Sequence, residues 1–227
     1  MKPTSIVCGI RNRNEIFTET LPTWLNFPVQ EIVIVDLRDN GCESVWDVVK
    51  DIQDNRIKVV QTNYEYCWSH GIAFNLGINV ATSPFILKLD ADYELRHDFF
   101  ERNVLEEHEF IQKWTGQGSG LFYLKKSMWK TVNGFDEDMP FWGYNDIDFR
   151  NRLIAAGFER KDWVKNTFKH KPHSIDMRAS QFGRKLQYRA RDILSQASQF
   201  NQFWLFTRIY GLLLVLAVFL EREIGRF

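Results

Sequence analysis

The sequence has few cysteines, no excess of either charge and no long uninterrupted apolar run. Its 227 residues carry 29 basic and 29 acidic side chains, so no general field attracts nucleic acid, and we expect no nucleic-acid partner. Three widely spaced cysteines, Cys8, Cys42 and Cys67, fit neither a disulfide framework nor a paired zinc motif, which favours a reducing, cytoplasmic setting. The apolar run near the N-terminus is too short for a signal peptide, so we expect no secretion.

An apolar tail follows a polar stretch near the C-terminus. Residues 200–220 are apolar apart from a few polar side chains and Arg208, and their uncharged part, residues 209–220, is shorter than the ~20 apolar residues that cross a bilayer. A helix on or anchored at a membrane surface and a helix packed on protein both remain open. We therefore expect one large domain over residues 1–178 and a helical tail over residues 179–227, in a protein that is cytoplasmic, with peripheral or tail-anchored membrane attachment as one option.

Apolar, β-branched runs alternate with helical periodicity along the first domain. The predicted strands are residues 5–10, 31–36, 56–61, 85–89 and 121–124. The predicted helices are residues 42–53, 70–81, 98–113, 127–132 and 145–156, with another helical pattern between the first two strands. This order predicts an α/β fold with a mainly parallel central sheet flanked by helices. In such sheets ligands bind beyond the carboxyl ends of the strands.

Two acids, Asp90 and Asp92, follow the fourth predicted strand in the run Leu-Asp-Ala-Asp. Carboxylate oxygens suit Mg²⁺ or Mn²⁺, and a metal at this edge can hold a diphosphate. An Asp-x-Asp pattern also occurs by chance in solvated loops. The position directly after a buried strand favours the ligand-binding interpretation.

Other strand ends carry Arg11 and Arg13 after the first strand and Asp36 at the end of the second. Guanidinium groups bind phosphate oxygens in a bidentate manner, although a solvated basic turn explains the arginines equally well. The Asp36 carboxylate can accept a hydrogen bond from the imide of a uracil. Capping of the following turn by the Asp36 side chain is the competing interpretation.

Two later segments add groups that can act on a ligand. His170 and His173 stand three residues apart in a chain with five histidines, which indicates either a metal site or isolated surface imidazoles. Residues 141–153 place Trp142 beside Asp146 at the predicted start of a helix. There Asp146 can accept a proton from a sugar hydroxyl while the indole stacks on the sugar ring. A helix-capping network of Asn145, Asp146 and Asp148 is the alternative.

Taken in order, these motifs resemble the nucleotide-sugar-dependent glycosyltransferases of the GT-A fold, family 2 and especially the beta-1,4-galactosyltransferase group. The resemblance spans about residues 4–175. It rests on Ile-Arg-Asn-Arg at 10–13, Phe-Asn-Leu-Gly-Ile-Asn at 74–79, Leu-Asp-Ala-Asp at 89–92, Val-Asn-Gly-Phe-Asp at 132–136, Trp-Gly-x-x-Asp-x-Asp with Asn-Arg-Leu at 142–153, and His-x-x-His-Ser at 170–174.

The resemblance implies a metal-dependent inverting transfer of a hexose or N-acetylhexosamine from a UDP-sugar to a glycan or other sugar acceptor. It assigns Mn²⁺ or Mg²⁺ to Asp92, His173 and His170, the last standing where the galactosyltransferases use a methionine. The implied nucleotide-sugar contacts are Arg11, Arg13, Asp36, Asp90 and Trp142.

The resemblance also implies roles at the acceptor side of the site. Asp146 is the implied catalytic base, and Trp142 lies beside both donor and acceptor. Asn145 faces the acceptor at a position where the family usually has glutamate, so the acceptor pocket differs in charge. Tyr144 replaces a small residue there and also changes the shape of that pocket.

Two other functions remain open from the sequence. A nucleotidyltransferase that makes sugar nucleotides also needs a strand-end acid and a metal, but it normally has a glycine- and lysine-rich phosphate loop, and residues 10–15 contain no glycine. A non-catalytic sugar-nucleotide-binding module recruited to a membrane by the tail is the other alternative.

Overall fold

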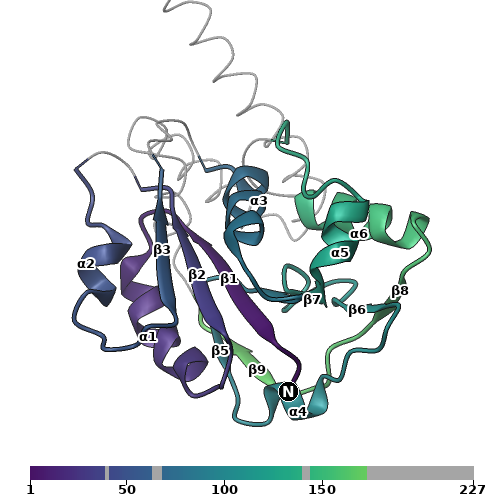
Figure 1. The fold of residues 1–227 in the computed structure, drawn as a ribbon, viewed down its shortest axis with the longest axis horizontal. Coiled ribbons are helices and arrows are strands. Elements are labelled where there is room, and N and C mark those ends of the chain that lie inside the picture. The colour runs from purple at the N-terminus through teal and green to yellow at the C-terminus, as the bar shows by residue number, and fades with distance from the viewer. Residues whose placement is uncertain (39–40, 63–67, 140–143, 173–227) are drawn as a thin grey trace, which may run out of the picture.

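A seven-stranded mixed sheet forms the centre of the molecule, with strand order β3-β2-β1-β4-β7-β6-β8 (Figure 1). The structure is a computed structural model that describes residues 1–38, 41–62, 68–139 and 144–172. The strands of this sheet are β1 (Thr4–Ile10), β2 (Glu31–Asp36), β3 (Ile57–Gln61), β4 (Phe85–Lys88), β6 (Glu109–Ile111), β7 (Phe122–Lys125) and β8 (Glu159–Lys161). A second, two-stranded sheet pairs β5 (Tyr93–Leu95) with β9 (Phe168–His170). The helices are α1 (Asn14–Leu25), α2 (Val45–Val49), α3 (His70–Val80), α4 (Phe99–Arg102), α5 (Lys126–Thr131) and α6 (Asn145–Ala155).

The first half of the sheet is parallel and the second half is mixed. Strands β3, β2, β1 and β4 run parallel, whereas β7 is antiparallel to both β4 and β6. All residues of β1 and β2 are buried, as expected for apolar strands covered on both faces. The predicted α/β class with a mainly parallel central sheet is confirmed.

Helices cover both faces of the sheet and form two cores. Alternation along β1 sends Ile6 and Cys8 into one core and Val7 into the other. Helices α1, α2 and α4 contribute to the first core, and helices α3, α5 and α6 contribute to the second. The site described below lies at the carboxyl ends of the parallel strands and takes residues from elements of both cores.

Close packing of α3 on the sheet depends on a glycine. A Cβ atom at Gly77 would lie 2.5 Å from Cγ1 of Val7 and 3.0 Å from Cγ2 of Val35. Because the helix backbone approaches β1 and β2 so closely, the first residue of α3, His70, is brought to the edge where the strands end.

The predicted helix over residues 98–113 is wrong. Only Phe99–Arg102 is helical, and the segment then continues to strand β6. Asn103 ends the helix, because its amide donates to the Phe99 carbonyl at 2.8 Å and its side-chain oxygen accepts from the Val164 amide at 2.9 Å. Phe110 and Ile111 then point into opposite cores, as neighbouring residues of a strand do. Tertiary contacts thus override the local helical pattern.

The predicted helix over residues 42–53 is shorter than expected and covers only Val45–Val49. The boundary at residue 178 and the tail over residues 179–227 lie outside the described residues, so the division into domain and tail stays a prediction. Within the described part of the chain, no helix has the length and apolar character needed to span a membrane.

Candidate active site

The strand-end groups meet at one edge of the sheet. Strands β1, β2 and β4 are parallel neighbours, so the residues that follow them emerge on the same side. Four of these residues are buried, with exposed fractions of 8% or less. They are Arg11, Arg13, Asp36 and Asp92.

Asp92 lies between a guanidinium group and an imidazole. Its Oδ2 atom is 3.5 Å from Nη1 of Arg13 and 3.4 Å from Nε2 of His170. The pairing of β5 with β9 places Tyr93 opposite His170, which explains how a histidine so distant in sequence reaches this carboxylate. The predicted neighbours Asp92 and His170 are therefore in contact, and the third predicted ligand, His173, lies outside the described residues.

The chemistry of the Asp92–His170 pair fits a hard or borderline divalent cation. Mg²⁺ and similar ions are usually held by one or two carboxylates together with substrate phosphates and water, rather than by a complete protein cage. Imidazole adds a donor that suits Mn²⁺. Within the described residues, no group of three or more His, Cys, Asp or Glu side chains converges in a way that could hold a metal ion. Asp92 and His170 alone would thus leave most coordination positions of a metal ion to substrate and solvent.

Asp36 makes the capping contacts that the sequence offered as an alternative. Its Oδ2 atom accepts hydrogen bonds from Ser44 Oγ and from the Val45 amide, both at 3.0 Å, and Oδ1 accepts from the Arg38 amide at 3.2 Å. These bonds hold the start of α2 against the end of β2. The predicted contact of Asp36 with uracil stays a prediction.

Lys88 joins the strand-end acids to the first turn of α6. This lysine is fully buried, and its Nζ atom lies 3.1 Å from Oδ1 of Asp90 and 3.1 Å from Oδ1 of Asp146. It also donates to the Gly120 carbonyl and lies 4.3 Å from the centroid of the Phe74 ring. Lys88 was not among the residues predicted from the sequence. A single charged residue inside an apolar strand is the signal that could have identified it.

His70 is a second site residue that was not predicted from the sequence. Its Nε2 atom is 3.3 Å from Oδ1 of Asp146, and its ring packs between Phe74 and Phe135, with centroid distances of 4.6 Å and 4.9 Å. Asp146 therefore contacts side chains from β4 and α3, which a simple cap of its own helix would not require. The Asp146 side chain remains 31% exposed, so one side of the carboxylate faces solvent.

The two carboxylates at Lys88 have pKa values that move in opposite directions. Burial disfavours ionisation of Asp146, but attraction to Lys88 and His70 outweighs it and lowers the pKa to about 2. Burial raises the pKa of Asp90, opposed by Lys88 and reinforced by Asp92 and Asp146. Such a divergence between neighbouring acids is common where one acid must stay ionised during a reaction.

Gly120 makes room for both carboxylates. A Cβ atom at this position would lie 2.8 Å from Oδ2 of Asp90 and 3.3 Å from Oδ2 of Asp146. The glycine-rich segment 116–120 thus ends directly against the two acids. A side chain at residue 120 would displace them.

The predicted acceptor residues are less fully described. Asn145 is buried, and its amide donates to the Met139 carbonyl at 3.1 Å, so its role toward an acceptor stays a prediction. Trp142 lies outside the described residues.

Comparison with known proteins supports the fold and the family resemblance. Residues 102–174 match the family model described as the N-terminal domain of galactosyltransferase. A mutant of Drosophila beta-1,4-galactosyltransferase 7, solved with manganese, UDP-Gal and xylobiose, has a similar structure, with a TM-score of 0.57 and 16% identity over 83% of this chain and 80% of that chain. This chain has the GT-A glycosyltransferase fold. The resemblance inferred from the sequence motifs is thereby confirmed.

Other proteins to which this GT-A chain is similar are also named as glycosyltransferases. A mannosyltransferase from Pyrobaculum calidifontis, solved with GDP-Man and Mn²⁺, has a TM-score of 0.62 at 15% identity, covering 85% of this chain and 65% of that one. A curated relative from Escherichia coli, UDP-Glc:alpha-D-GlcNAc-diphosphoundecaprenol beta-1,3-glucosyltransferase WfaP, is 27% identical over 92 residues, or 40% of this chain. The matched part spans about a third of that relative's length, 36%.

Proposed function

We propose that this chain is a metal-dependent inverting glycosyltransferase that moves a hexose or N-acetylhexosamine from a UDP-sugar to a glycan or other sugar acceptor. The observation that carries the proposal is the presence of two charged groups at the carboxyl ends of the parallel strands: Asp92 with Arg13 and His170, and Lys88 with Asp90 and Asp146. Two of the similar proteins support the choice of a UDP-hexose, since their names include UDP-Gal with manganese and UDP-Glc. The third, named with GDP-Man and Mn²⁺, supports only the use of a sugar nucleotide together with a metal.

In this proposal the donor binds along the strand ends. Arg11 and Arg13 contact the diphosphate, because buried guanidinium groups bind phosphate oxygens strongly. Asp36 and Asp90 contact the nucleotide-sugar, and Trp142 lies beside donor and acceptor. Asp92, His170 and His173 would hold Mn²⁺ or Mg²⁺, which supplies positive charge to stabilise the departing UDP.

Asp146 acts as the base that removes the proton from the acceptor hydroxyl. Lys88 and His70 hold this carboxylate ionised and fixed in place, while its exposed side faces the solvent from which an acceptor arrives. Because Asp146 is fully ionised, it can accept a proton, but its low pKa also makes it a weak base. Its basicity rises when the acceptor excludes water and when Lys88 turns toward Asp90 or the donor phosphates. Asn145 borders the acceptor.

The experiment that tests this proposal is a UDP-release assay. The full chain is incubated with Mn²⁺ and a panel of UDP-hexoses and UDP-N-acetylhexosamines, with and without sugar acceptors. We expect Mn²⁺-dependent release of UDP from at least one donor, and loss of release with EDTA or in Asp92→Asn. Release of pyrophosphate from a nucleoside triphosphate and a sugar phosphate would instead indicate a nucleotidyltransferase. Tight UDP-sugar binding with no turnover would indicate a binding module.

We place the reaction in polysaccharide assembly on the cytoplasmic side of a membrane. The curated relative is named for an acceptor linked to diphosphoundecaprenol, which is a membrane lipid, and the apolar tail of this chain suits peripheral attachment. Co-sedimentation of the full chain with vesicles, compared with a chain ending at residue 178, tests this placement. Equal recovery of both chains in the supernatant would contradict it.

A further inference from the structure

Arg150 on α6 is a buried cation whose contacts in the described residues include no carboxylate. Its residue surface is 5% exposed. The Nη1 atom donates to the Trp114 carbonyl at 3.0 Å, and the guanidinium carbon lies 3.8 Å from the centroid of the Trp114 ring. The Nε atom is buried and has no hydrogen-bond partner among the described residues. The guanidinium is therefore held by an indole and one backbone oxygen, with donors left over.

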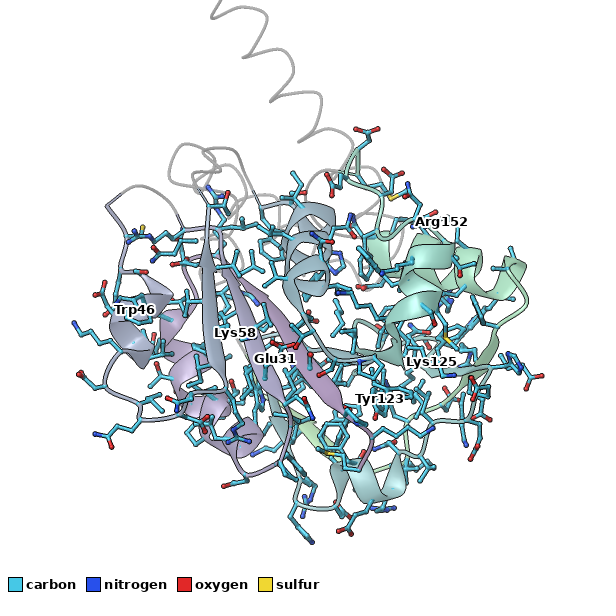
Figure 2. All side chains as sticks on the ribbon, in the orientation of Figure 1. Glu31, Trp46, Lys58, Tyr123, Lys125 and Arg152 are labelled. Atoms are coloured by element: carbon cyan, nitrogen blue, oxygen red, sulfur yellow. The ribbon has the colours of Figure 1, made fainter. Side chains whose placement is uncertain are left out.

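Arg152, two residues further along the same helix, is an arginine whose charge is balanced by a carboxylate (Figure 2). Its guanidinium pairs with Asp148 at 2.6 Å and donates to the Val132 and Gly134 carbonyls. A buried charge without a counter-charge costs free energy, so it persists in a natural protein where another ligand supplies that charge. Arg150 has the features of such a site, and Arg152 does not.

A second cation strengthens the positive charge at Arg150. The guanidinium carbon of Arg160 lies 5.3 Å from the centroid of the same Trp114 ring. Burial, and secondly Arg160, lower the pKa of Arg150, which Asp146 partly opposes. Arg160 has its own partner in Asp162 at 2.7 Å, whereas Arg150 has none of that kind in the described chain.

Arg150 and Asp146 lie on the same side of α6. They are four residues apart, so they face the same direction at a separation of about 6 Å along the helix axis. Trp114 is 51% exposed and begins the segment whose Gly120 lies against Asp146. Base and guanidinium are thus separated by roughly the width of one sugar ring, and the indole marks the side that is open to solvent.

We propose that Arg150 binds an anionic group, a phosphate or a carboxylate, attached to the acceptor sugar whose hydroxyl reaches Asp146. This assignment rests on the proposed glycosyl transfer and names the class of its acceptor. The Nε edge of the guanidinium binds the anion, because planar guanidinium groups match both phosphate and carboxylate geometry. The Trp114 indole, which lies over the guanidinium face, is half exposed and lies on no helix, so it can move without disturbing a core helix. The acceptor is therefore a charged sugar, such as a sugar 1-phosphate or diphosphate or a uronic acid.

The test uses isothermal titration calorimetry of the full chain saturated with UDP and Mn²⁺, so that the donor phosphate site is filled. The probes are N-acetylglucosamine 1-phosphate, glucose 1-phosphate, methyl glucuronide and the neutral methyl N-acetylglucosaminide. We expect wild-type protein to bind at least one anionic probe, and Arg150→Gln to weaken that binding ~10- to 100-fold. Arg150→Lys should recover part of the affinity, since it keeps the charge but loses the fork. Binding of the neutral probe should be the same in all three proteins.

Arg102→Gln is the matched control. It removes the same charge from an exposed arginine on α4, far from α6 in the fold (Figure 1), and should bind every probe as wild type does. The assignment fails if folded Arg150→Gln binds the anionic probes as tightly as wild type, or if no anionic probe binds better than the neutral one. Vesicles containing phosphatidylglycerol serve as a further probe. Arg150-dependent binding to these vesicles alone would also overturn the assignment. If the wild-type protein does not bind UDP with Mn²⁺, the proposed function is overturned instead. The titrations with the anionic probes are then carried out without UDP.

Discussion

The sheet of this protein carries two networks of lysine and carboxylate side chains, one at each end of its parallel strands. At the amino ends, Glu31 accepts from Ser5 and Thr82 and pairs with Lys58 at 2.5 Å (Figure 2). At the carboxyl ends, Lys88 joins Asp90 and Asp146. In both networks burial opposes ionisation of a carboxylate, but its partners overcome that effect and lower the pKa to about 2.

The two networks differ in how far their carboxylates are closed off from solvent and occupied by protein donors. The Glu31 side chain is 2% exposed, and both of its oxygens accept from protein donors. The Asp146 side chain is 31% exposed, and its Oδ2 atom faces the glycine-rich segment. A carboxylate pKa of about 2 therefore has two meanings: in a closed network it stabilises the fold, whereas in an open network the carboxylate is also accessible to a substrate. A perturbed pKa indicates a reactive site only when it is combined with access.

Asp146→Asn should have the largest effect on the open network. We expect transfer to fall ~10²- to 10⁴-fold, the usual contribution of a general base, because an amide cannot accept the hydroxyl proton. Affinity for UDP with Mn²⁺ should stay within a few-fold of wild type. Steady-state transfer rates and UDP titrations measure the two quantities. A variant that transfers sugar at the wild-type rate would remove Asp146 from the role of base.

Lys88→Met should destabilise the fold by about 3–5 kcal/mol at neutral pH, because it leaves Asp90 and Asp146 without their shared cation. The contribution of Asp90 and Asp146 to the pH dependence should also change sign. In wild type the low pKa of Asp146 stabilises the fold at pH values above its unfolded pKa of ~3.9, and this stabilisation is lost as pH falls toward 2. In the variant the two acids have raised pKa values, so their contribution is fully present in acid and is lost as pH rises, while Glu31 keeps its opposite contribution. Urea unfolding between pH 3 and pH 7 measures both slopes, and parallel curves would contradict the open-network interpretation.

Glu31→Gln tests the closed network and should affect stability alone. A pKa of about 2 in the fold against ~4.3 when unfolded corresponds to about 3 kcal/mol at neutral pH, so we expect a loss of about 2–3 kcal/mol. Wild-type stability should fall as pH drops from ~5 to ~2, and the variant should show a flatter curve. Urea unfolding at pH 7 and pH 3 measures this. UDP affinity of the folded variant should equal that of wild type, and a large change would mean that the two networks are coupled.

The sequence was sufficient for the parts of the site that follow strand ends. Arg13 and Asp92 come directly after apolar strands, and a parallel sheet brings such positions together whatever the rest of the chain does. The contact of Asp92 with His170 was expected from the family resemblance, and the pairing of β5 with β9 explains it. The fold class followed from the same alternation of strands and helices.

The remaining parts depend on contacts that local patterns do not contain. Residues 98–113 have a helical pattern, but Asn103 finds partners about sixty residues away and ends the helix after one turn. Lys88 and His70 reach Asp146 only because β4, α3 and α6 meet in space. Arg150 could not be distinguished from Arg152 in the sequence, because the presence of a carboxylate four residues before each of them predicts a pair for both. Only Arg152 forms its pair.

Lys58→Met should have the smallest effect, although it removes the same kind of side chain as Lys88→Met. The Lys58 side chain is 45% exposed, and an ion pair with an exposed partner typically contributes 1 kcal/mol or less, so we expect a loss of ~1 kcal/mol. Glu31 keeps its bonds from Ser5 and Thr82, and these continue to hold its pKa down. Urea unfolding at pH 7 beside Lys88→Met measures the contrast. A loss as large as that of Lys88→Met would show that the lysine, rather than the closure of the network, determines stability at the amino ends.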